Sequence, residues 1–258
     1  MKEDGKSIMS NSLEFRRAAI LKMVNEQGSL NFSEIRAAFP GVSDVTLRKD
    51  LQFLDDSQQA IRTHGGIKSM PSALNYFYRA NVNRELKKEI AAKAAALIKP
   101  GDSIFLSAGT SCAELARCLP SVPLKLCSDG VYTVSNISTM PNISVELLGG
   151  EVDLNIMRVE GISALNRLEN LHFTIAFIGA LGINLDYGFL HNSAMTVALL
   201  EKVVERADKV VALVDHTKIT NSFTNYTLPL STVDVVVSDR EFPKEAGNRL
   251  GAKGIEVI

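Results

Sequence analysis

The chain of 258 residues contains only three cysteines, at positions 112, 118 and 127. An odd number without the spacing of metal ligands argues against a disulfide framework and a metal site, and it indicates a reducing compartment. Residues 1–7 are polar and lack the apolar core of a signal peptide, and no apolar run is long enough to cross a bilayer. We therefore expect a cytoplasmic protein with no membrane partner, no metal and no cofactor.

The chain also lacks an excess of positive charge. It has 28 Lys and Arg against 29 Asp and Glu, which gives a formal net charge of -1 and a pI near 6.4. No overall basic field would attract nucleic acid. Binding to nucleic acid would depend on a few local basic residues: Arg16, Arg17, Arg48, Lys49, Arg62 and Lys68. The hydrophobic content of 46% is enough for one large or two ordinary domains.

Residues 43–54 have the pattern of an amphipathic helix. Ser43 is a favourable N-cap. Three leucines follow at i, i+4 and i+7 and would share a buried face: Leu47, Leu51 and Leu54. The opposite face and its flanks carry side chains that can contact bases or phosphates in a major groove: Val45, Thr46, Arg48, Lys49 and Gln52. The pattern leaves open which side chain contacts which group.

Two further helices are expected upstream. The amphipathic pattern of residues 13–24 predicts a helix that ends at Gly28. Asn31 with Glu34 resembles the capping box at the start of a second helix. Pro40 and Gly41 then break the chain just before residue 43. This order is typical of a helix-turn-helix, in which a short turn separates the support helix from the reading helix.

The segment Arg62-Thr63-His64-Gly65-Gly66 would close this module as a wing. The two glycines permit a positive φ or a close approach of the backbone to phosphate, and Arg62 and His64 supply donors at the DNA surface. Residues 1–70 are thus predicted to be a winged helix-turn-helix domain that binds double-stranded DNA. Its candidate contacts are Ser43, Val45, Thr46, Arg48, Lys49, Gln52, Arg62, His64, Gly65 and Gly66. Because a monomer would bind weakly, we expect a homodimer or homotetramer that presents two reading helices.

A second domain, residues 71–258, is expected after a connector at residues 69–72. The aromatic segment 75–79 would lie at a seam between domains or at a dimer contact. A helical stripe follows and ends at Pro100-Gly101, formed by Leu86, Ile90, Ala94, Leu97 and Ile98. Seven short apolar runs then predict a mostly parallel, Rossmann-like α/β sheet: 103–106, 124–127, 144–148, 174–178, 209–214, 233–237 and 255–257.

Ligands of such sheets bind at the carboxyl ends of the strands, so the residues after each run are informative. The segment from Ser107 to Cys112 leads into a helix expected from Ala113, and its hydroxyls and free amides suit a phosphate. Lys218 offers a point charge for a phosphate, and Asp215 can accept hydrogen bonds from sugar hydroxyls. The candidate effector contacts are Ser107, Gly109, Thr110, Ser111, Cys112, Ser128, Asp129, Gly149, Gly150, Gly179, Gly182, Asp215, Lys218 and Lys87.

These residues together resemble the DeoR family of bacterial transcriptional regulators over nearly the whole chain. The resemblance rests on the segment 42–51, on residues 62–66, on the Gly-Thr-Ser loop, on Gly149-Gly150, and on Asp215 with Lys218. It implies an amino-terminal winged helix-turn-helix and a sensor domain similar in fold to sugar-phosphate isomerases. It further implies a regulator, most often a repressor, that responds to a phosphorylated intermediate of carbohydrate metabolism.

The chain departs from the family pattern at several positions. The reading helix has Arg48-Lys49 where the family usually has two arginines, which could alter base preference. Asp129 is the most consequential departure, because a carboxylate facing a phosphate repels it unless Lys218 or Lys87 offsets the charge. The other departures are Ser107 and Thr174 in place of acidic residues, Ser111, and Ala194 in place of a glutamate.

Two other functions compete with this one. An isomerase-like enzyme could use acid and base groups chosen from Asp129, Asp215, His216 and His191, although a small isomerase has no use for a DNA-reading module. Alternatively, the second domain could be purely oligomeric, with a silent sensor. Cys112 is interpreted as a packed small residue rather than a nucleophile.

Overall fold

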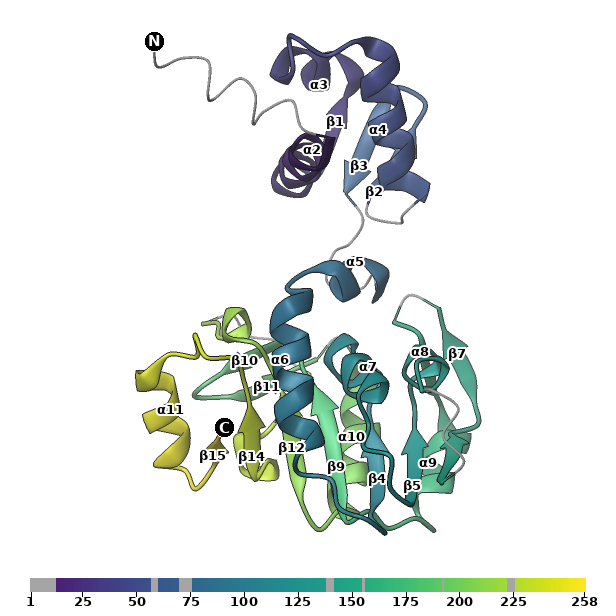
Figure 1. Ribbon diagram of the computed structural model, residues 1–258, viewed down its shortest axis with the longest axis vertical. Helices are drawn as coiled ribbons and strands as arrows, with labels where there is room; N and C mark the ends of the chain where they lie inside the picture. Colours follow the sequence, from purple (N-terminus) through teal and green to yellow (C-terminus); the bar gives the residue numbers. More distant parts are fainter. Residues whose placement is uncertain are drawn as a thin grey trace. The chain divides into compact units, whose positions relative to one another are not determined.

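The computed structural model describes residues 13–56, 60–69, 76–137, 142–154, 156–191, 193–221 and 226–258 (Figure 1). The chain divides into two compact units, residues 1–79 and 80–258, each described here by itself. The boundary expected near residue 71 lies outside the described residues. Within the described ranges, no helix is both long and apolar enough to cross a membrane.

The first unit is a small helical domain with a three-stranded antiparallel sheet, ordered β1-β3-β2. Its elements are α2 (Leu13–Gln27), β1 (Ser29–Asn31), α3 (Phe32–Ala38), α4 (Asp44–Asp56), β2 (Ala60–Thr63) and β3 (Gly66–Ser69). Both predicted helix boundaries upstream of α4 are confirmed: Gly28 has a φ of +79° just after α2, and Asn31 forms a full capping box with Glu34. The short strand β1, which the sequence did not predict, pairs with the wing strand β3.

Helix α4 is the predicted reading helix. The amide of Thr46 donates to Oγ of Ser43 at 3.3 Å, so Ser43 caps the helix as expected. The three predicted leucines are at most 2% exposed and join one core with residues of α2, α3, β1 and the wing: Leu47, Leu51 and Leu54. The winged helix-turn-helix architecture is therefore confirmed.

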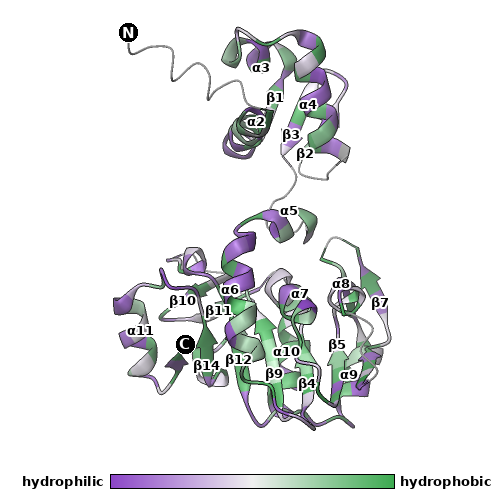
Figure 2. Cartoon of the chain, viewed as in Figure 1, coloured by the Kyte–Doolittle hydropathy of each residue, from purple (hydrophilic) through white to green (hydrophobic). Residues whose placement is uncertain are grey.

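The second unit contains a parallel sheet of seven strands, ordered β15-β14-β12-β9-β4-β5-β6. The strands are β4 (Ser103–Leu106), β5 (Leu124–Ser128), β6 (Ile143–Leu147), β9 (Ile175–Gly179), β12 (Val210–Leu213), β14 (Val235–Val237) and β15 (Glu256–Val257). Each strand falls on one of the seven predicted apolar runs. The central strands β12, β9 and β4 are strongly hydrophobic (Figure 2) and almost fully buried, as expected for strands covered on both faces, whereas the edge strands β6 and β15 are more exposed.

Helices cover both faces of this sheet. They are α6 (Arg84–Ala95), α7 (Thr110–Arg117), α8 (Val131–Ser135), α9 (Ile162–Leu168), α10 (Ala194–Glu205) and α11 (Lys244–Gly251), and α5 (Tyr76–Asn81) precedes them. Ile104 and Leu106 of β4 pack with α6 and α7, whereas Phe105 packs with α9 and α10 on the other face. Helix α7 begins at Thr110, three residues before the expected Ala113, because the chain turns into the helix directly after Gly109.

The order of the strands creates a topological switch point. From β4 the chain moves to β5 and β6 on one side and then returns to β9 on the other side of β4. Loops at the carboxyl ends of β4 and β9 therefore run in opposite directions, which in sheets of this kind leaves a ligand crevice at the switch point. The sequence-based choice of residues after these strands is consistent with this geometry.

The second unit also contains short elements that the sequence did not predict. They are the hairpin β7 (Glu151–Asp153) and β8 (Arg158–Glu160), the small sheet of β10 (Gly182–Asn184), β11 (Gly188–Leu190) and β13 (Thr227–Leu228), and the 3-10 helices η1 (His216–Lys218) and η2 (Leu230–Thr232). The hairpin is bonded to the end of β5, because the amide of Val159 donates to the carbonyl of Asp129 at 2.7 Å.

Candidate DNA-reading and effector sites

The outer face of α4 presents the predicted reading side chains. Val45 is 64% exposed, and Arg48 and Lys49 are also exposed. Thr46 is half-buried, and its hydroxyl lies 2.9 Å from that of Ser43 within the cap. Gln52 is half-buried, and its side-chain oxygen accepts a hydrogen bond from Nη1 of Arg62 in the wing.

Two of the basic residues expected to bind DNA have a structural role instead. Arg16 and Arg17 of α2 place their Nε atoms 2.5 Å and 2.9 Å from the carboxylate of Asp50 on α4, and Asp50 is fully buried. The guanidinium of Arg17 also lies 3.7 Å from the ring centroid of Phe53. A buried carboxylate needs such partners. The expectation that Arg16 and Arg17 serve DNA binding is therefore wrong.

The glycines of the wing also differ from expectation. Neither Gly65 nor Gly66 has a positive φ. Gly66 is buried, and a Cβ there would lie 2.1 Å from the carbonyl oxygen of Leu30 in β1. The close backbone approach that requires glycine is therefore to β1 and not to a phosphate. Arg62, His64 and Gly65 are exposed, and the carbonyl of Gly65 accepts from the amide of Phe32 at 2.9 Å.

In the second unit, a buried arginine, Arg158, contacts several elements at the carboxyl edge of the sheet. Nε of Arg158 lies 2.9 Å from Oδ2 of Asp129, and Nη1 donates to Oγ1 of Thr196 at 2.8 Å. Nη2 donates at 3.1 Å both to Oγ of Ser107 and to the carbonyl of Ala108. One guanidinium from β8 thus joins the ends of β4 and β5 to the first turn of α10.

Asp129 does not present a free carboxylate to the crevice. It is fully buried, and its Oδ1 accepts from the amide of Ala108 at 2.5 Å. Burial raises the pKa of Asp129, while the Arg158 guanidinium acts against that rise. The sequence predicts that Lys218 or Lys87 would offset this charge, but the carboxylate forms its ion pair with Arg158. Lys87 is buried and donates from Nζ to the carbonyl of Val82.

His191 lies between β11 and α10 beside this cluster. The residue is 6% exposed, and its Nε2 has no hydrogen-bond partner among the described residues. Burial, with a smaller contribution from Arg158, lowers the pKa of His191 to about 3. The imidazole is therefore neutral at physiological pH. A buried nitrogen of this kind can bond a ligand hydroxyl without a further charge in the cluster.

The beginning of α7 has the features expected of an anion site. Its N-cap is Gly109, which supplies no side-chain hydrogen bond, and Thr110 and Ser111 in the first turn are each 9% exposed. Cys112 is fully buried, its Sγ donates to the carbonyl of Phe177 at 3.6 Å, and burial raises its pKa to about 12. Cys112 is thus a packed thiol, as interpreted from the sequence, and its place among the effector contacts was wrong.

Ser128 is another predicted effector contact that the fold uses internally. It is fully buried, donates to the carbonyl of Leu106 at 2.6 Å and accepts from the amide of Gly130 at 2.9 Å. The predicted glycines are distributed differently: Gly149 and Gly150 are exposed after β6, Gly179 is half-buried at the end of β9, and Gly182 is buried at the start of β10.

Asp215 and Lys218 lie at the carboxyl end of β12. Asp215 is buried and caps η1, with its Oδ1 accepting from the amide of Thr217 at 3.1 Å and from Nδ2 of Asn83 at 3.4 Å. Lys218 is half-buried at the end of η1. His216 pairs through Nδ1 with Asp239 at 2.8 Å, and this hydrogen bond raises the pKa of His216. Within the described part of the chain, no hydrogen bond or ion pair joins any two of the acid and base candidates Asp129, Asp215, His216 and His191.

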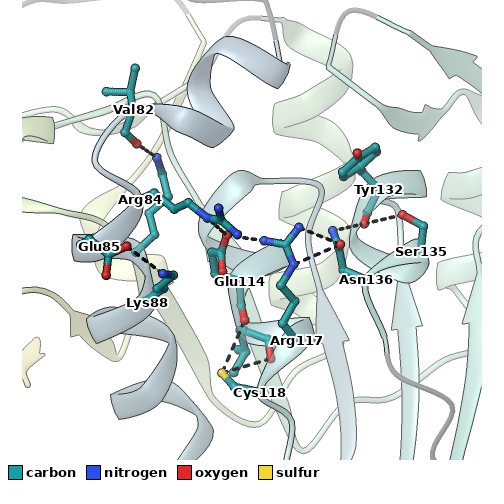
Figure 3. A network of polar contacts seen from close by, with 12 residues as sticks. Val82, Arg84, Glu85, Lys88, Glu114, Arg117, Cys118, Tyr132, Ser135 and Asn136 are labelled. Atoms are coloured by element: carbon teal, nitrogen blue, oxygen red, sulfur yellow. Dashed lines mark hydrogen bonds and ion pairs between the residues drawn. The ribbon is translucent and has the colours of Figure 1, made fainter. Parts of the chain in front are cut away.

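A polar network holds α7 in place (Figure 3). Oε1 of the buried Glu114 lies 2.5 Å from Nη1 of Arg117 and 3.4 Å from Nε of Arg84 on α6. Arg117 also donates to Oδ1 of Asn136, at the end of α8, from Nε and Nη2 at 3.2 Å and 2.9 Å. Helix α7 is therefore bonded to both of its neighbours, α6 and α8.

Comparison with known proteins agrees with this two-unit architecture. The family model of the DeoR-like helix-turn-helix domain matches residues 16–73, and that of the DeoR C-terminal sensor domain matches residues 82–240. The chain belongs to the DeoR family of transcriptional regulators.

Relatives of this DeoR-family regulator match along almost their whole length. The HTH-type transcriptional regulator GolR of Listeria innocua is 30% identical over 94% of this chain and 96% of its own. The HTH-type transcriptional repressor GlcR of Bacillus subtilis is 29% identical over 95% of both chains. Among solved structures, ribose 5-phosphate isomerase A of Methanocaldococcus jannaschii has 20% identity and a TM-score of 0.40 over 55% of this chain and 56% of its own.

Two residues at the carboxyl edge of this DeoR-family regulator were not predicted from the sequence: Arg158 and Thr196, whose side chains share a hydrogen bond. His191, whose pKa Arg158 helps to lower, was considered only as an enzyme group. Little in the sequence indicates Arg158, because a single arginine in a strand of three residues does not form a recognisable motif. Thr196 could have been found as the third residue after the N-cap Ser193, in the first turn of α10.

Proposed function

We propose that this DeoR-family regulator represses genes of carbohydrate metabolism and that a phosphorylated sugar, bound at the switch-point crevice, controls its affinity for an operator. The observation that carries the proposal is the topological switch point between β4 and β9, where α7 follows directly after β4. An uncapped helix N-terminus at a switch point is a favourable place for a phosphate.

The DNA-binding part of the proposal uses the exposed face of α4 and the wing. Val45, Lys49 and Gln52 would contact base edges, and Arg48, Arg62 and His64 would add contacts from the wing side. Ser43 and Thr46 would act at the start of α4, and Gly65 and Gly66 would shape the wing. The support is that Val45, Arg48, Lys49, Arg62 and His64 are all exposed.

In the effector part of the proposal, two groups of residues bind different parts of the ligand. The first-turn amides of α7, at Thr110 and Ser111, would bind the phosphate, with Lys218 as a counter-charge. Nε2 of His191 would bond a hydroxyl of the sugar. Support comes from this nitrogen, which is buried and has no hydrogen-bond partner within the described residues.

An enzymatic role for the second unit is not favoured. General acid-base catalysis needs an acid and a base that reach one substrate together. Among the described residues, no hydrogen bond or ion pair joins any two of the four candidate groups, and His216, whose pKa is raised, is bonded to Asp239 instead. Burial lowers the pKa of His191 to about 3, and Asp129 is paired with Arg158. We infer that the chain binds its sugar phosphate without turning it over.

Three coarser features complete the proposal. A winged helix-turn-helix domain at residues 1–70 would be joined to an effector-binding and oligomerisation domain at residues 71–258. The protein would act in the cytoplasm, which is in keeping with three free cysteines. It would bind its operator as a homodimer or homotetramer, because two reading helices bind one operator far more tightly than a single helix.

A thermal-shift screen of the full-length protein tests the effector assignment. Sugar phosphates and their unphosphorylated parents are compared, and a ligand present at 100 times its Kd should stabilise the protein by roughly 2.7 kcal/mol. Only a phosphorylated sugar should produce the shift. Lys218→Ala should remove it, whereas Lys125→Ala, an exposed lysine of β5, should not. Indifference to every sugar phosphate would favour the silent-sensor alternative, and turnover of a bound sugar phosphate would favour the enzyme.

A further inference from the structure

The first unit contains a hollow between α4, the start of α3 and the wing. Arg48 of α4 and Arg62 and His64 of the wing line it, and Phe32 and Leu51 contribute apolar surface. None of the residues that line the hollow within the described part of the chain is acidic. Two permanent cations and an imidazole thus surround one small space without a carboxylate to neutralise them.

Arg48 is held beside this hollow by an aromatic ring. Its guanidinium carbon lies 4.7 Å from the ring centroid of Phe32, the first residue of α3. The amide of Phe32 is itself bonded to the wing at Gly65. A guanidinium stacked on a ring gains a cation-π interaction and loses little further freedom when it binds an anion.

Arg62 is fixed from the opposite side. Its amide donates to Oδ1 of Asp55 at 2.9 Å, and its Nη1 donates to the side-chain oxygen of Gln52, so both contacts are with α4. The hollow is therefore a preorganised cationic site, in contrast to a pair of freely moving surface arginines.

The helical geometry separates this hollow from the rest of the reading face. Arg48 and Leu51 of α4 line the hollow, whereas the exposed Val45 and Lys49 do not. At about 100° per residue, Lys49 points well away from Arg48. The two neighbouring basic residues of α4 are thus directed to different parts of a bound duplex.

We propose that this hollow binds one backbone phosphate of the operator, that Arg48 and Arg62 are its ligands, and that Phe32 is a positioning residue for Arg48. Base recognition then falls to the face that carries Val45 and Lys49. The proposal rests on the DNA-reading face proposed above, and it assigns to Arg48 a role that carries no direct sequence information.

The test uses the full-length protein and a duplex that this protein enriches from a random-sequence library. Each phosphate of the duplex is replaced in turn by a neutral methylphosphonate, and affinities are measured for the wild type and for Arg48→Ala. We expect one phosphate per half-site whose neutralisation weakens the wild type about tenfold, the scale of one charge-assisted hydrogen bond. Arg48→Ala should bind more weakly and should show a clearly smaller further loss at that phosphate, because Arg62 is then the only one of the two arginine ligands left to contact it.

Matched variants separate positioning from folding and from base reading. Phe32→Leu should lower affinity and reduce the penalty at the same phosphate, Phe32→Tyr should restore both, and thermal unfolding should confirm that both variants are folded. Lys49→Ala should change the base preference and leave the methylphosphonate pattern intact. A changed base preference in Arg48→Ala, or an unchanged penalty at every phosphate, would overturn the proposal. Failure of the wild type to enrich any duplex would instead refute the DNA-reading face. If millimolar inorganic phosphate displaced the duplex from the wild type but not from Arg48→Ala, the hollow would be a site for free anions, which would overturn the assignment to a backbone phosphate.

Discussion

Arg158 and Asp129 form an ion pair of 2.9 Å in which the two side chains are only 6% and 0% exposed. The arginine comes from the β7–β8 hairpin and the aspartate from the end of β5. Because the guanidinium also bonds Ser107, Ala108 and Thr196, it connects the elements that border the proposed effector crevice.

Removal of this arginine should leave a buried carboxylate without its counter-charge. We expect Arg158→Ala to lower the free energy of unfolding by about 3 to 5 kcal/mol. Urea unfolding at neutral pH measures this change. The double variant Arg158→Met with Asp129→Asn should recover part of the loss, since it removes both charges. A loss below about 1 kcal/mol in the single variant would show that the pair is not important for stability.

The pH dependence of stability should reveal the buried His191. Its folded-state pKa of about 3 lies below the ordinary unfolded value near 6.5, so the unfolded chain takes up the proton first as the pH falls. The stability that depends on the neutral form is fully present above pH 6.5 and is lost below it, by up to about 1.4 kcal/mol per pH unit. Urea unfolding at pH 7 and pH 5 should therefore show a smaller loss for His191→Gln than for the wild type. His172→Gln, at an exposed histidine, should behave like the wild type.

Basic residues of the first unit should separate into stabilising and DNA-binding classes. Arg16→Ala should lower the free energy of unfolding by about 3 to 5 kcal/mol, because it removes one partner of the buried Asp50. Lys49→Ala should leave the free energy of unfolding within about 0.5 kcal/mol and weaken operator binding. Urea unfolding and a binding titration on the same variants provide the comparison. Equal operator affinity in Lys49→Ala would contradict the assigned reading face.

The wing glycines should tolerate substitution very differently. Gly66→Ala places a Cβ 2.1 Å from a backbone oxygen of β1, which neither strand can avoid without breaking their pairing. We expect a loss of about 1 to 3 kcal/mol in thermal or urea unfolding, the usual range for overpacking. Gly65→Ala is the control, because nothing lies within 4 Å of its Cβ. Similar losses of stability for the two variants would mean that the close approach of β1 is not the reason why position 66 requires glycine.

The elements that could be predicted from the sequence are those whose signal is local. The capping box at Asn31 and the leucine spacing of α4 are short-range patterns, and each central strand is an apolar run long enough to be distinctive. Strands of two or three residues, such as β8 and β13, have no such pattern. They are defined by pairing with segments that are distant in sequence.

The sequence could predict which residues follow the strands but not their contacts. Candidates such as Asp129 and Asp215 do lie at the carboxyl edge of the sheet, because parallel strands all end on the same side. The partner of Asp129 was not predictable, since Arg158 reaches Ser107 across 51 positions of sequence and no local pattern signals the contact. The same limit applies to Arg16. The sequence around a basic residue near a reading helix looks the same whether that residue contacts DNA or a buried carboxylate such as Asp50.

Arg62 bonds to α4 twice, through its backbone amide to Asp55 and through its side chain to Gln52, and these bonds connect the wing to the predicted reading helix. If both parts contact DNA as proposed, the two bonds oppose a change in their separation. In an assembly of two copies on one operator, the distance between the copies would then be the quantity left to adjust. Operators with one base pair inserted between half-sites would measure the effect of that distance on affinity.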